Sequence, residues 1–107
     1  MERVLIVARM DESDLDTVAQ IWKESDETEL PHIVGVQQRS LFYYQGLYFQ
    51  LIEAEQPLGP KIEAVRKHPL FTDVNDKLAN HIKAYDPETW RGPKDAMAHR
   101  FYSWKAA

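Results

Sequence analysis

The chain has 107 residues, of which 44% are hydrophobic and 28% charged, and its formal net charge at pH 7 is −4. This length and composition predict a single globular domain, residues 1–107, with a hydrophobic core of its own. The negative net charge gives no electrostatic basis for binding nucleic acid or an anionic membrane, so neither partner is expected. The lack of cysteine excludes disulfides, thiolate nucleophiles and sulfur-ligated metals. The first residues lack the apolar segment of a secretory signal, and no run reaches about 20 apolar residues, so we expect a cytoplasmic protein.

The first third of the chain predicts a strand followed by an amphipathic helix. Residues 4–8 are a continuous apolar run, which is typical of a strand buried on both faces. Apolar residues then recur at helical spacing over residues 15–22 and predict a helix that ends at about residues 24–26. Pro31 disfavours helical backbone at the residue before it and marks a loop.

The stretch 35–53 predicts a β-hairpin around which the rest of the chain is organised. Two β-prone runs flank a Gln-Gly pair at 45–46, and glycine readily adopts the positive φ that a tight turn requires. The second run, 47–52, is apolar on both faces except for Gln50, as expected of a central strand. The first run begins with polar residues, including Arg39, and this is typical of an edge strand.

The second half of the chain predicts two more helices and a closing strand. An apolar stripe over residues 58–65 predicts one helix, and a second stripe over residues 74–82, with Thr72 as its N-cap, predicts another. Residues 86–94 contain two prolines and a glycine and predict a long connection. The aromatic run 97–104 predicts the last strand.

This order of elements is the βαββαβ pattern of a ferredoxin-like fold, in the α+β class with an antiparallel sheet. The runs that are apolar on both faces are the first and third strands, which this fold places at the centre of the sheet. The more polar second and fourth strands fall at its edges. Helices then cover one face of the sheet only. In a chain this short a second copy is the expected cover of the other face, which predicts a homodimer.

The sequence contains none of the strong catalytic signatures. It has no nucleophile elbow, phosphate-binding loop, paired-histidine zinc motif or dinucleotide fingerprint. The four histidines are scattered without the spacing of metal ligands, so no metal site is predicted. His68 precedes a proline at the end of a helix, and a capping role is favoured for it over a catalytic one.

Three polar residues each allow two interpretations. Gln50 is either a core amide bonded to a neighbour or a group that contacts a ligand. Arg39 is either a surface residue of an edge strand or a fixed cation that holds an enolate or phenolate oxygen. Asp26 is either a solvated carboxylate or a general base or orienting group at the mouth of a pocket. Aromatic residues are abundant, and a subset that lines a flat cavity would suit an aromatic or polyketone ligand.

Several short segments, in order along nearly the whole chain, form a recognisable set. They read Ala-Arg-Met-Asp at 8–11, Thr-Glu-Leu-Pro at 28–31, Gly-Val at 35–36 with Arg-Ser-Leu-Phe at 39–42, Leu-Tyr at 47–48 with Leu-Ile-Glu-Ala at 51–54, His-Pro-Leu-Phe at 68–71 and Phe-Tyr-Ser-Trp at 101–104. Together they resemble the small polyketide cyclases of the tetracenomycin cyclase type, from bacterial aromatic polyketide pathways.

The resemblance implies a dimeric α+β barrel with one cavity per subunit, and no cofactor and no metal. It implies late intramolecular aldol cyclisation, with loss of water, of a partly cyclised aromatic polyketide intermediate. Association with a polyketide synthase complex is a further expectation. Two other functions remain open: a cofactor-independent monooxygenase acting on an anthrone-like polyketide, and a non-catalytic, chaperone-like subunit of a polyketide synthase.

The resemblance also assigns the site. Asp26 matches an acidic position of the family and Arg39 an arginine, whereas Ser25 and Gln50 stand where the family can carry histidine. We expect Asp26 as base or orienting group, Arg39 as the group that stabilises the enolate, and Gln50 as a hydrogen-bond partner of a ring oxygen. The residues expected to bind substrate are Ser25, Trp22, Tyr48, His68 and Trp104.

Overall fold

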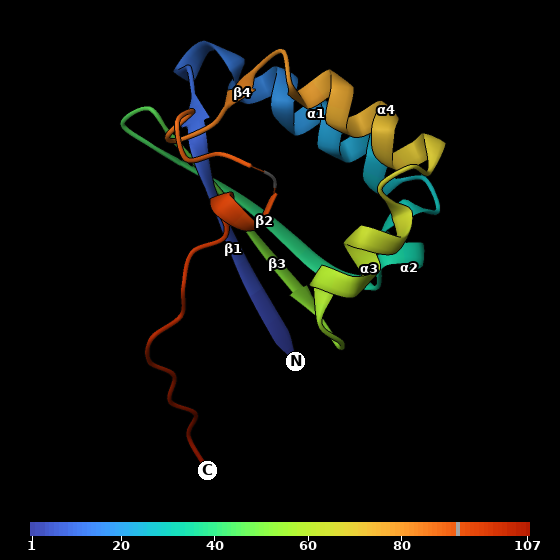
Figure 1. The fold of residues 1–107 in the computed structure, drawn as a ribbon, viewed down its shortest axis with the longest axis vertical. Coiled ribbons are helices and arrows are strands. Elements are labelled where there is room, and N and C mark those ends of the chain that lie inside the picture. Colours follow the sequence, from blue (N-terminus) through green and yellow to red (C-terminus); the bar gives the residue numbers. More distant parts are fainter. Residues whose placement is uncertain (92) are drawn as a thin grey trace.

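The computed structural model describes residues 1–91 and 93–107 and shows a four-stranded antiparallel sheet that curls into a half-barrel beside a layer of helices (Figure 1). The strands are β1 (Glu2–Met10), β2 (Val36–Tyr44), β3 (Leu47–Ala54) and β4 (Ile82–Lys83), in the order β2-β3-β1-β4. The predicted α+β, ferredoxin-like class is confirmed, and so is the central position of the first and third strands.

Four helices lie on one side of the sheet: α1 (Leu15–Asp26), α2 (Leu30–Val34), α3 (Leu58–Val65) and α4 (Pro69–Leu78) (Figure 1). Their apolar stripes face the sheet, and none of the helices in the part of the chain described is long and apolar enough to cross a bilayer.

The hairpin of β2 and β3 has the geometry that its sequence predicts. Gln45 has φ 44° and Gly46 has φ 85°, so both turn residues are left-handed, as in the type I′ turn that matches the twist of two paired strands. The backbone N–H of Gly46 donates to the hydroxyl of Tyr43 at 2.9 Å and fixes the turn against its own strand. Tyr44 therefore pairs directly with Leu47.

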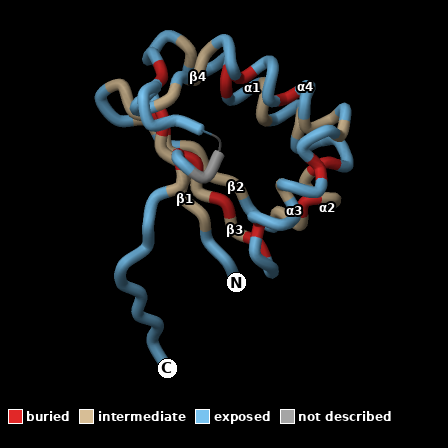
Figure 2. The backbone as a smooth tube through the Cα atoms, in the orientation of Figure 1, coloured by how far each residue is buried: buried red, intermediate tan, exposed pale blue. Residues whose placement is uncertain are grey.

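The prediction of a closing strand at residues 97–104 is wrong. Met97 makes one isolated bridge with Ile6, the N–H of Ala98 donates to the carbonyl of Leu5 at 2.7 Å, and the segment that follows is exposed and extends away from the body (Figure 2). The fourth strand is instead the two-residue β4, which pairs with the end of β1.

Two boundary predictions near the helices are also wrong. The helix predicted over 74–82 ends at Leu78, so Ile82 belongs to β4, and its N-cap is His68 rather than Thr72. His68 accepts the N–H of Leu70 at 3.1 Å through Nδ1, so it caps the start of α4 and not, as the sequence indicates, the end of the helix before it. The loop marked by Pro31 contains the short helix α2, because proline fits the first turn of a helix.

Alternation along the strands separates a covered face from an open one. On β3 the even-numbered residues, from Tyr48 to Ala54, are buried beneath the helices, whereas Phe49 and Leu51 point to the opposite face and are only half-buried. The core is formed by the covered face together with inward residues such as Val18 of α1, which is 1% exposed.

Candidate active site

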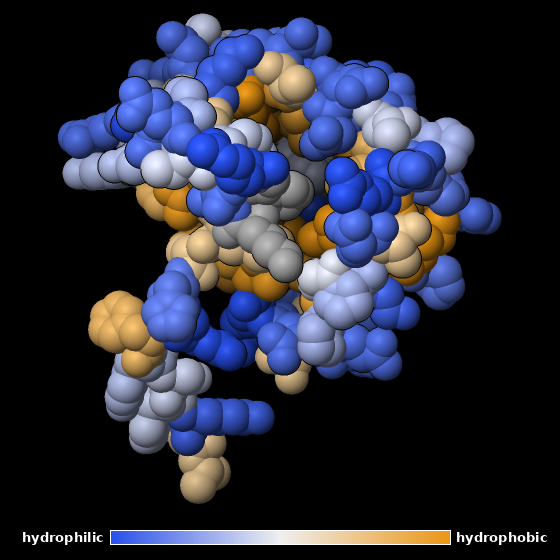
Figure 3. All heavy atoms as spheres, viewed as in Figure 1, coloured by the Kyte–Doolittle hydropathy of each residue, from blue (hydrophilic) through white to orange (hydrophobic). Residues whose placement is uncertain are grey.

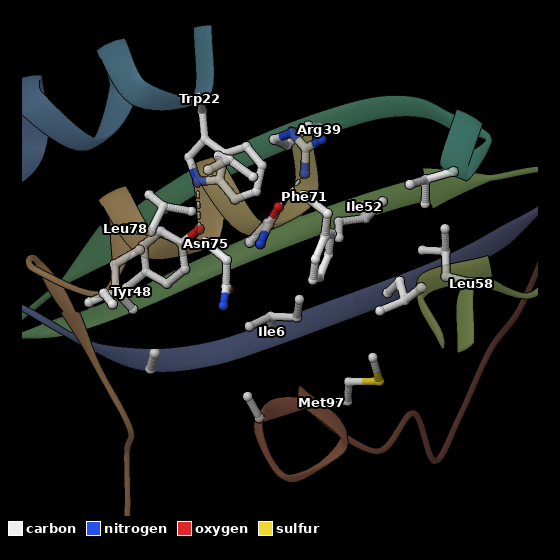
Figure 4. A pocket seen from close by; sticks show the side chains of 18 of the residues that line it. Ile6, Trp22, Arg39, Tyr48, Ile52, Leu58, Phe71, Asn75, Leu78 and Met97 are labelled. Atoms are coloured by element: carbon white, nitrogen blue, oxygen red, sulfur yellow. Dashed lines mark hydrogen bonds between the residues drawn. The ribbon is translucent and has the colours of Figure 1, made fainter. Parts of the chain in front are cut away.

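A cavity of about 530 Å³ lies between the covered face of the sheet and the helices. On the face drawn in Figure 3, polar side chains surround a hollow at whose edge apolar side chains are visible. The lining is mainly apolar, with side chains from all four strands, all four helices and the segment before Met97 (Figure 4). It consists of Ile6, Ala8, Trp22, Leu30, Pro31, Val34, Val36, Arg39, Tyr48, Gln50, Ile52, Leu58, Ile62, Phe71, Val74, Asn75, Leu78, Ala79, Ile82, Lys83, Ala84, Trp90, Ala96 and Met97.

The register of the hairpin brings two polar residues together at this cavity. Gln50 pairs with Leu41 and Arg39 pairs with Ile52, so Arg39 and Gln50 are diagonal neighbours on the covered face. A register irregularity between Val36 and Gln38 shifts the alternation of β2, and Arg39 then points inward although the strand lies at an edge.

Arg39 is fixed by three different contacts. Its Nε and Nη2 atoms donate to the carboxylate of Asp26 at 3.0 and 2.9 Å, and Nη1 donates to Oε1 of Gln50. Its Cζ atom lies 4.0 Å from the ring centroid of Trp22, in a cation–π contact. The Arg39 side chain is 11% exposed and that of Asp26 36%, so the arginine of this ion pair is largely buried and the carboxylate is partly solvated.

A second hydrogen bond joins the helix layer to the sheet. Nε1 of Trp22 on α1 donates to the hydroxyl of Tyr48 on β3 at 3.1 Å (Figure 4). Burial raises the pKa of Tyr48 to about 12, against the opposing effects of the Trp22 hydrogen bond and the positive charge of Arg39. Tyr48 is therefore a neutral phenol in the wall of the cavity at ordinary pH.

The structure gathers five of the eight residues that the sequence assigned to the site. Trp22, Arg39, Tyr48 and Gln50 line the cavity, and Asp26 stands directly behind Arg39. Both carboxylate oxygens of Asp26 accept hydrogen bonds from Arg39, and this carboxylate is not part of the cavity wall.

The other three assigned residues lie elsewhere. Ser25 lines a small groove between α1 and α4, His68 caps α4, and Trp104 is 75% exposed in the C-terminal segment. Their role in substrate binding stays a prediction that the geometry of one chain does not support.

Helix α4 contributes cavity residues that sequence reasoning missed. Phe71 and Asn75 point from α4 toward the sheet, and both line the cavity (Figure 4). Their spacing of i, i+4 places them on one face of the helix, which was the signal available in the sequence. The sequence does not mark Asn75 as a cavity residue, because a single amide on a helix is usually solvated.

The described residues include no group of three histidine, aspartate or glutamate side chains arranged to hold a metal ion. The polar groups of the cavity lining are a guanidinium, an ammonium, a phenol, two indoles and two amides. Hydrogen-bond donors in the wall of an apolar cavity are suited to holding the oxygen atoms of a flat ligand in one orientation.

The family described as "Polyketide synthesis cyclase" matches residues 2–105 of the chain. The chain belongs to this family of cyclases. Tetracenomycin F2 cyclase of Streptomyces glaucescens is similar to this chain, with 41% identity over 97% of this chain and 94% of its own length. The protein named polyketide synthase CurG of Streptomyces cyaneus is 46% identical over 98% of both chains.

The cyclase fold is shared in full with a solved structure. The structure of tetracenomycin F2 cyclase from S. glaucescens, described as a type II polyketide cyclase, superposes with a TM-score of 0.94 at 40% identity and covers 100% of both chains. The predicted resemblance to polyketide cyclases is therefore confirmed.

Proposed function

We propose that this protein is a cofactor-free cyclase that catalyses a late intramolecular aldol cyclisation, with loss of water, of a partly cyclised intermediate in bacterial aromatic polyketide biosynthesis. The observation that carries the proposal is the apolar cavity of about 530 Å³ with a cluster of fixed polar side chains on its wall. Membership of the polyketide cyclase family supports the class of reaction.

An aldol closure makes three demands on the site. A proton must leave a carbon between two carbonyls, the resulting enolate must be held, and a carbonyl oxygen must take up a proton. A carbon of this kind is already acidic, so the larger demand is to fold the ligand until the carbon and the carbonyl meet. Such positioning can lower the activation barrier by up to about 7–11 kcal/mol. The closure and the loss of water involve no net oxidation, so the reaction requires no redox cofactor.

The geometry supports a distinct role for each polar residue. Asp26 directs both oxygens at Arg39, an arrangement that favours an orienting role over that of a general base. Arg39 and Gln50 form the polar end of the cavity, where an enolate oxygen would be stabilised. Phe71 and Trp22 provide aromatic surface for a flat ring system.

We also propose a homodimer that covers the open face of the sheet. This face carries the apolar residues Leu5, Val7, Phe49 and Leu51 beside Phe42, which is 55% exposed. These residues pair across the sheet as Phe42–Phe49–Val7 and as Leu51–Leu5, so they form one continuous patch. Association with a polyketide synthase complex, which would supply the intermediate, belongs to the same proposal.

The test is an assay of the purified protein with a tricyclic polyketone intermediate, under air and under nitrogen, with products followed by mass. Loss of one water in both atmospheres is the expected result. An oxygen-dependent gain in mass would replace the cyclase with a monooxygenase. A product distribution equal to that in buffer would leave a binding subunit of the synthase instead.

A further inference from the structure

Gln50 is a buried amide in the wall of the cavity. It lies at the centre of β3, it is 5% exposed, and its Oε1 atom accepts a hydrogen bond from Nη1 of Arg39. An amide has an accepting end and a donating end, so the direction in which it points decides what the cavity offers to a ligand.

Arg39 dictates that direction. A guanidinium has five N–H donors and no acceptor, so Gln50 must turn its oxygen toward Arg39 and its NH₂ group away. Arg39 is itself immobilised by the carboxylate of Asp26 and by the ring of Trp22, so neither partner is free to exchange roles.

The NH₂ group of Gln50 points at ligand space. Within the part of the chain that the structure describes, no hydrogen bond is made by Nε2 of Gln50, and no fully buried side-chain nitrogen or oxygen lacks a partner. The NH₂ group is therefore accessible, and the accessible volume beside it is the cavity. Two unused donors of a fixed, neutral amide therefore face the cavity.

The described lining of the cavity contains no carboxylate and no imidazole beside this amide. Its titratable side chains are Arg39, Tyr48 and Lys83, with Asp26 behind Arg39, and neither a carboxylate nor an imidazole is among the lining residues. Lys83 is exposed at the rim, where Nζ donates to the carbonyl of Ala79 at 2.9 Å.

We propose that Gln50 is the oxyanion-binding residue of the cavity, that its NH₂ group donates to an enolate or phenolate oxygen of a flat ligand, and that Arg39 is a positioning residue that acts through Gln50. The class of ligand rests on the proposed function. The direction of the amide does not, since it follows from the donor-only chemistry of Arg39. The site thus prefers a ligand in its ionised, enolate-like form.

The test uses alizarin (1,2-dihydroxyanthraquinone), whose phenol and phenolate forms differ in visible absorption. The dye is titrated with pH, free and bound, in wild type, in Gln50→Met and in the matched control Gln56→Met, which changes an exposed glutamine of the loop after β3. We expect binding to the wild type and to Gln56→Met to lower the pKa of the phenol by about one unit. Binding to Gln50→Met should lower the pKa of the phenol clearly less, because only the more distant charge of Arg39 remains.

A double-mutant comparison tests the positioning role. Arg39→Lys keeps the positive charge but cannot hold Asp26 and Gln50 at the same time, so alone it should reduce the shift of the dye. Added to Gln50→Met it should change nothing further, because Arg39 acts through the amide. A full additional loss in the double variant would place the ligand oxygen on Arg39 itself and overturn the proposal.

Two other results would also overturn it: an equal shift in wild type and Gln50→Met, or no binding of the dye to the wild type. Gln50→Glu serves as a second variant if Gln50→Met does not fold, because a carboxylate offers acceptors where the amide offers donors and should raise the pKa of the bound phenol. The proposed function fails separately, through the absence of polyketone turnover by the wild type, which these absorption titrations do not measure.

Discussion

The two faces of β3 are built from alternate residues of one strand and have opposite surroundings. Gln50 and Ile52 are each 5% exposed beneath the helices and line the cavity. Phe49 and Leu51, their neighbours in sequence, lie on the face that the helices leave open and are only half-buried. Hydrophobicity alone does not separate the two faces, since both carry large apolar side chains. What separates them is the polar cluster around Arg39, which occurs on the cavity side.

The largest effect is expected from a charge placed on the open face of the sheet. Leu51→Asp would place a carboxylate at the centre of the apolar patch, twice in a symmetric dimer. Burying this carboxylate without a partner is costly. We therefore expect the dissociation constant of the dimer to rise at least a hundredfold, which is a loss of about 2.7 kcal/mol in binding free energy, while the chain stays folded. Sedimentation of the wild type and the variant measures this. A wild type that is monomeric at micromolar concentration would end the dimer proposal.

The matching change on the covered face should act on folding instead. Ile52→Ala removes a buried side chain from the core, and the free energy of unfolding should fall by about 2–3 kcal/mol, at the lower end of the usual range because one side of Ile52 already faces the cavity. Urea denaturation measures the loss. The control is Leu51→Ala, which should lower the free energy of unfolding of the monomer clearly less than Ile52→Ala does. Equal losses in the two variants would contradict the distinction between the faces.

Replacing the centre of the polar cluster should affect catalysis. Arg39→Ala removes the partner that orients Gln50 and leaves Asp26 without its cation. We expect kcat/KM for the polyketone to fall at least tenfold, or about 1.4 kcal/mol. The exposed Arg66→Ala, whose ion pair with Glu63 lies on the surface, is the control. Unchanged kinetics in Arg39→Ala would remove Arg39 from the site.

The smallest effect is expected at Tyr48. Tyr48→Phe deletes the acceptor of the Trp22 N–H, and the free energy of unfolding at pH 7 should fall by about 1 kcal/mol. The pKa of Tyr48 is about 12 in the folded protein and lies near 10 in the unfolded chain, so its contribution is complete below pH 10 and is lost as pH rises toward 12. Urea denaturation from pH 7 to 11.5 should show a steeper alkaline decline in the wild type. Parallel profiles would contradict the assignment.

The parts of the fold that were predictable from sequence are those with a period or a turn signal. Residues 4–8, the hairpin and the helix stripes each carry such a pattern, and the structure contains all of them. Ile82 was misplaced because it continues the i, i+4 spacing of Val74 and Leu78, and a strand of two residues has no period of its own. The aromatic run 97–104 has a β-prone composition, which predicts a strand, but a strand also needs a free edge to pair with, and the sequence does not show where such an edge lies.

The site was predictable only as a set of residue types. The pairing of Arg39 with Gln50 follows from hairpin register once the turn is known. The contact between Arg39 and Asp26 depends on how α1 packs on the sheet, and no local pattern encodes that angle. For the same reason Asn75 was missed, because its approach to the cavity is set by the docking of α4.

The pairing pattern of the sheet also determines when the cavity can exist. β2 and β3 are joined by a turn of only two residues. The pairs Ala8–Tyr48 and Ile6–Met97 are separated by much longer stretches of sequence. Hairpins close in about 1–10 μs, and contacts of long sequence separation form more slowly. The cavity wall needs Ile6, Tyr48 and Met97 together. A nascent chain on the ribosome therefore lacks part of the cavity wall until Met97 has emerged.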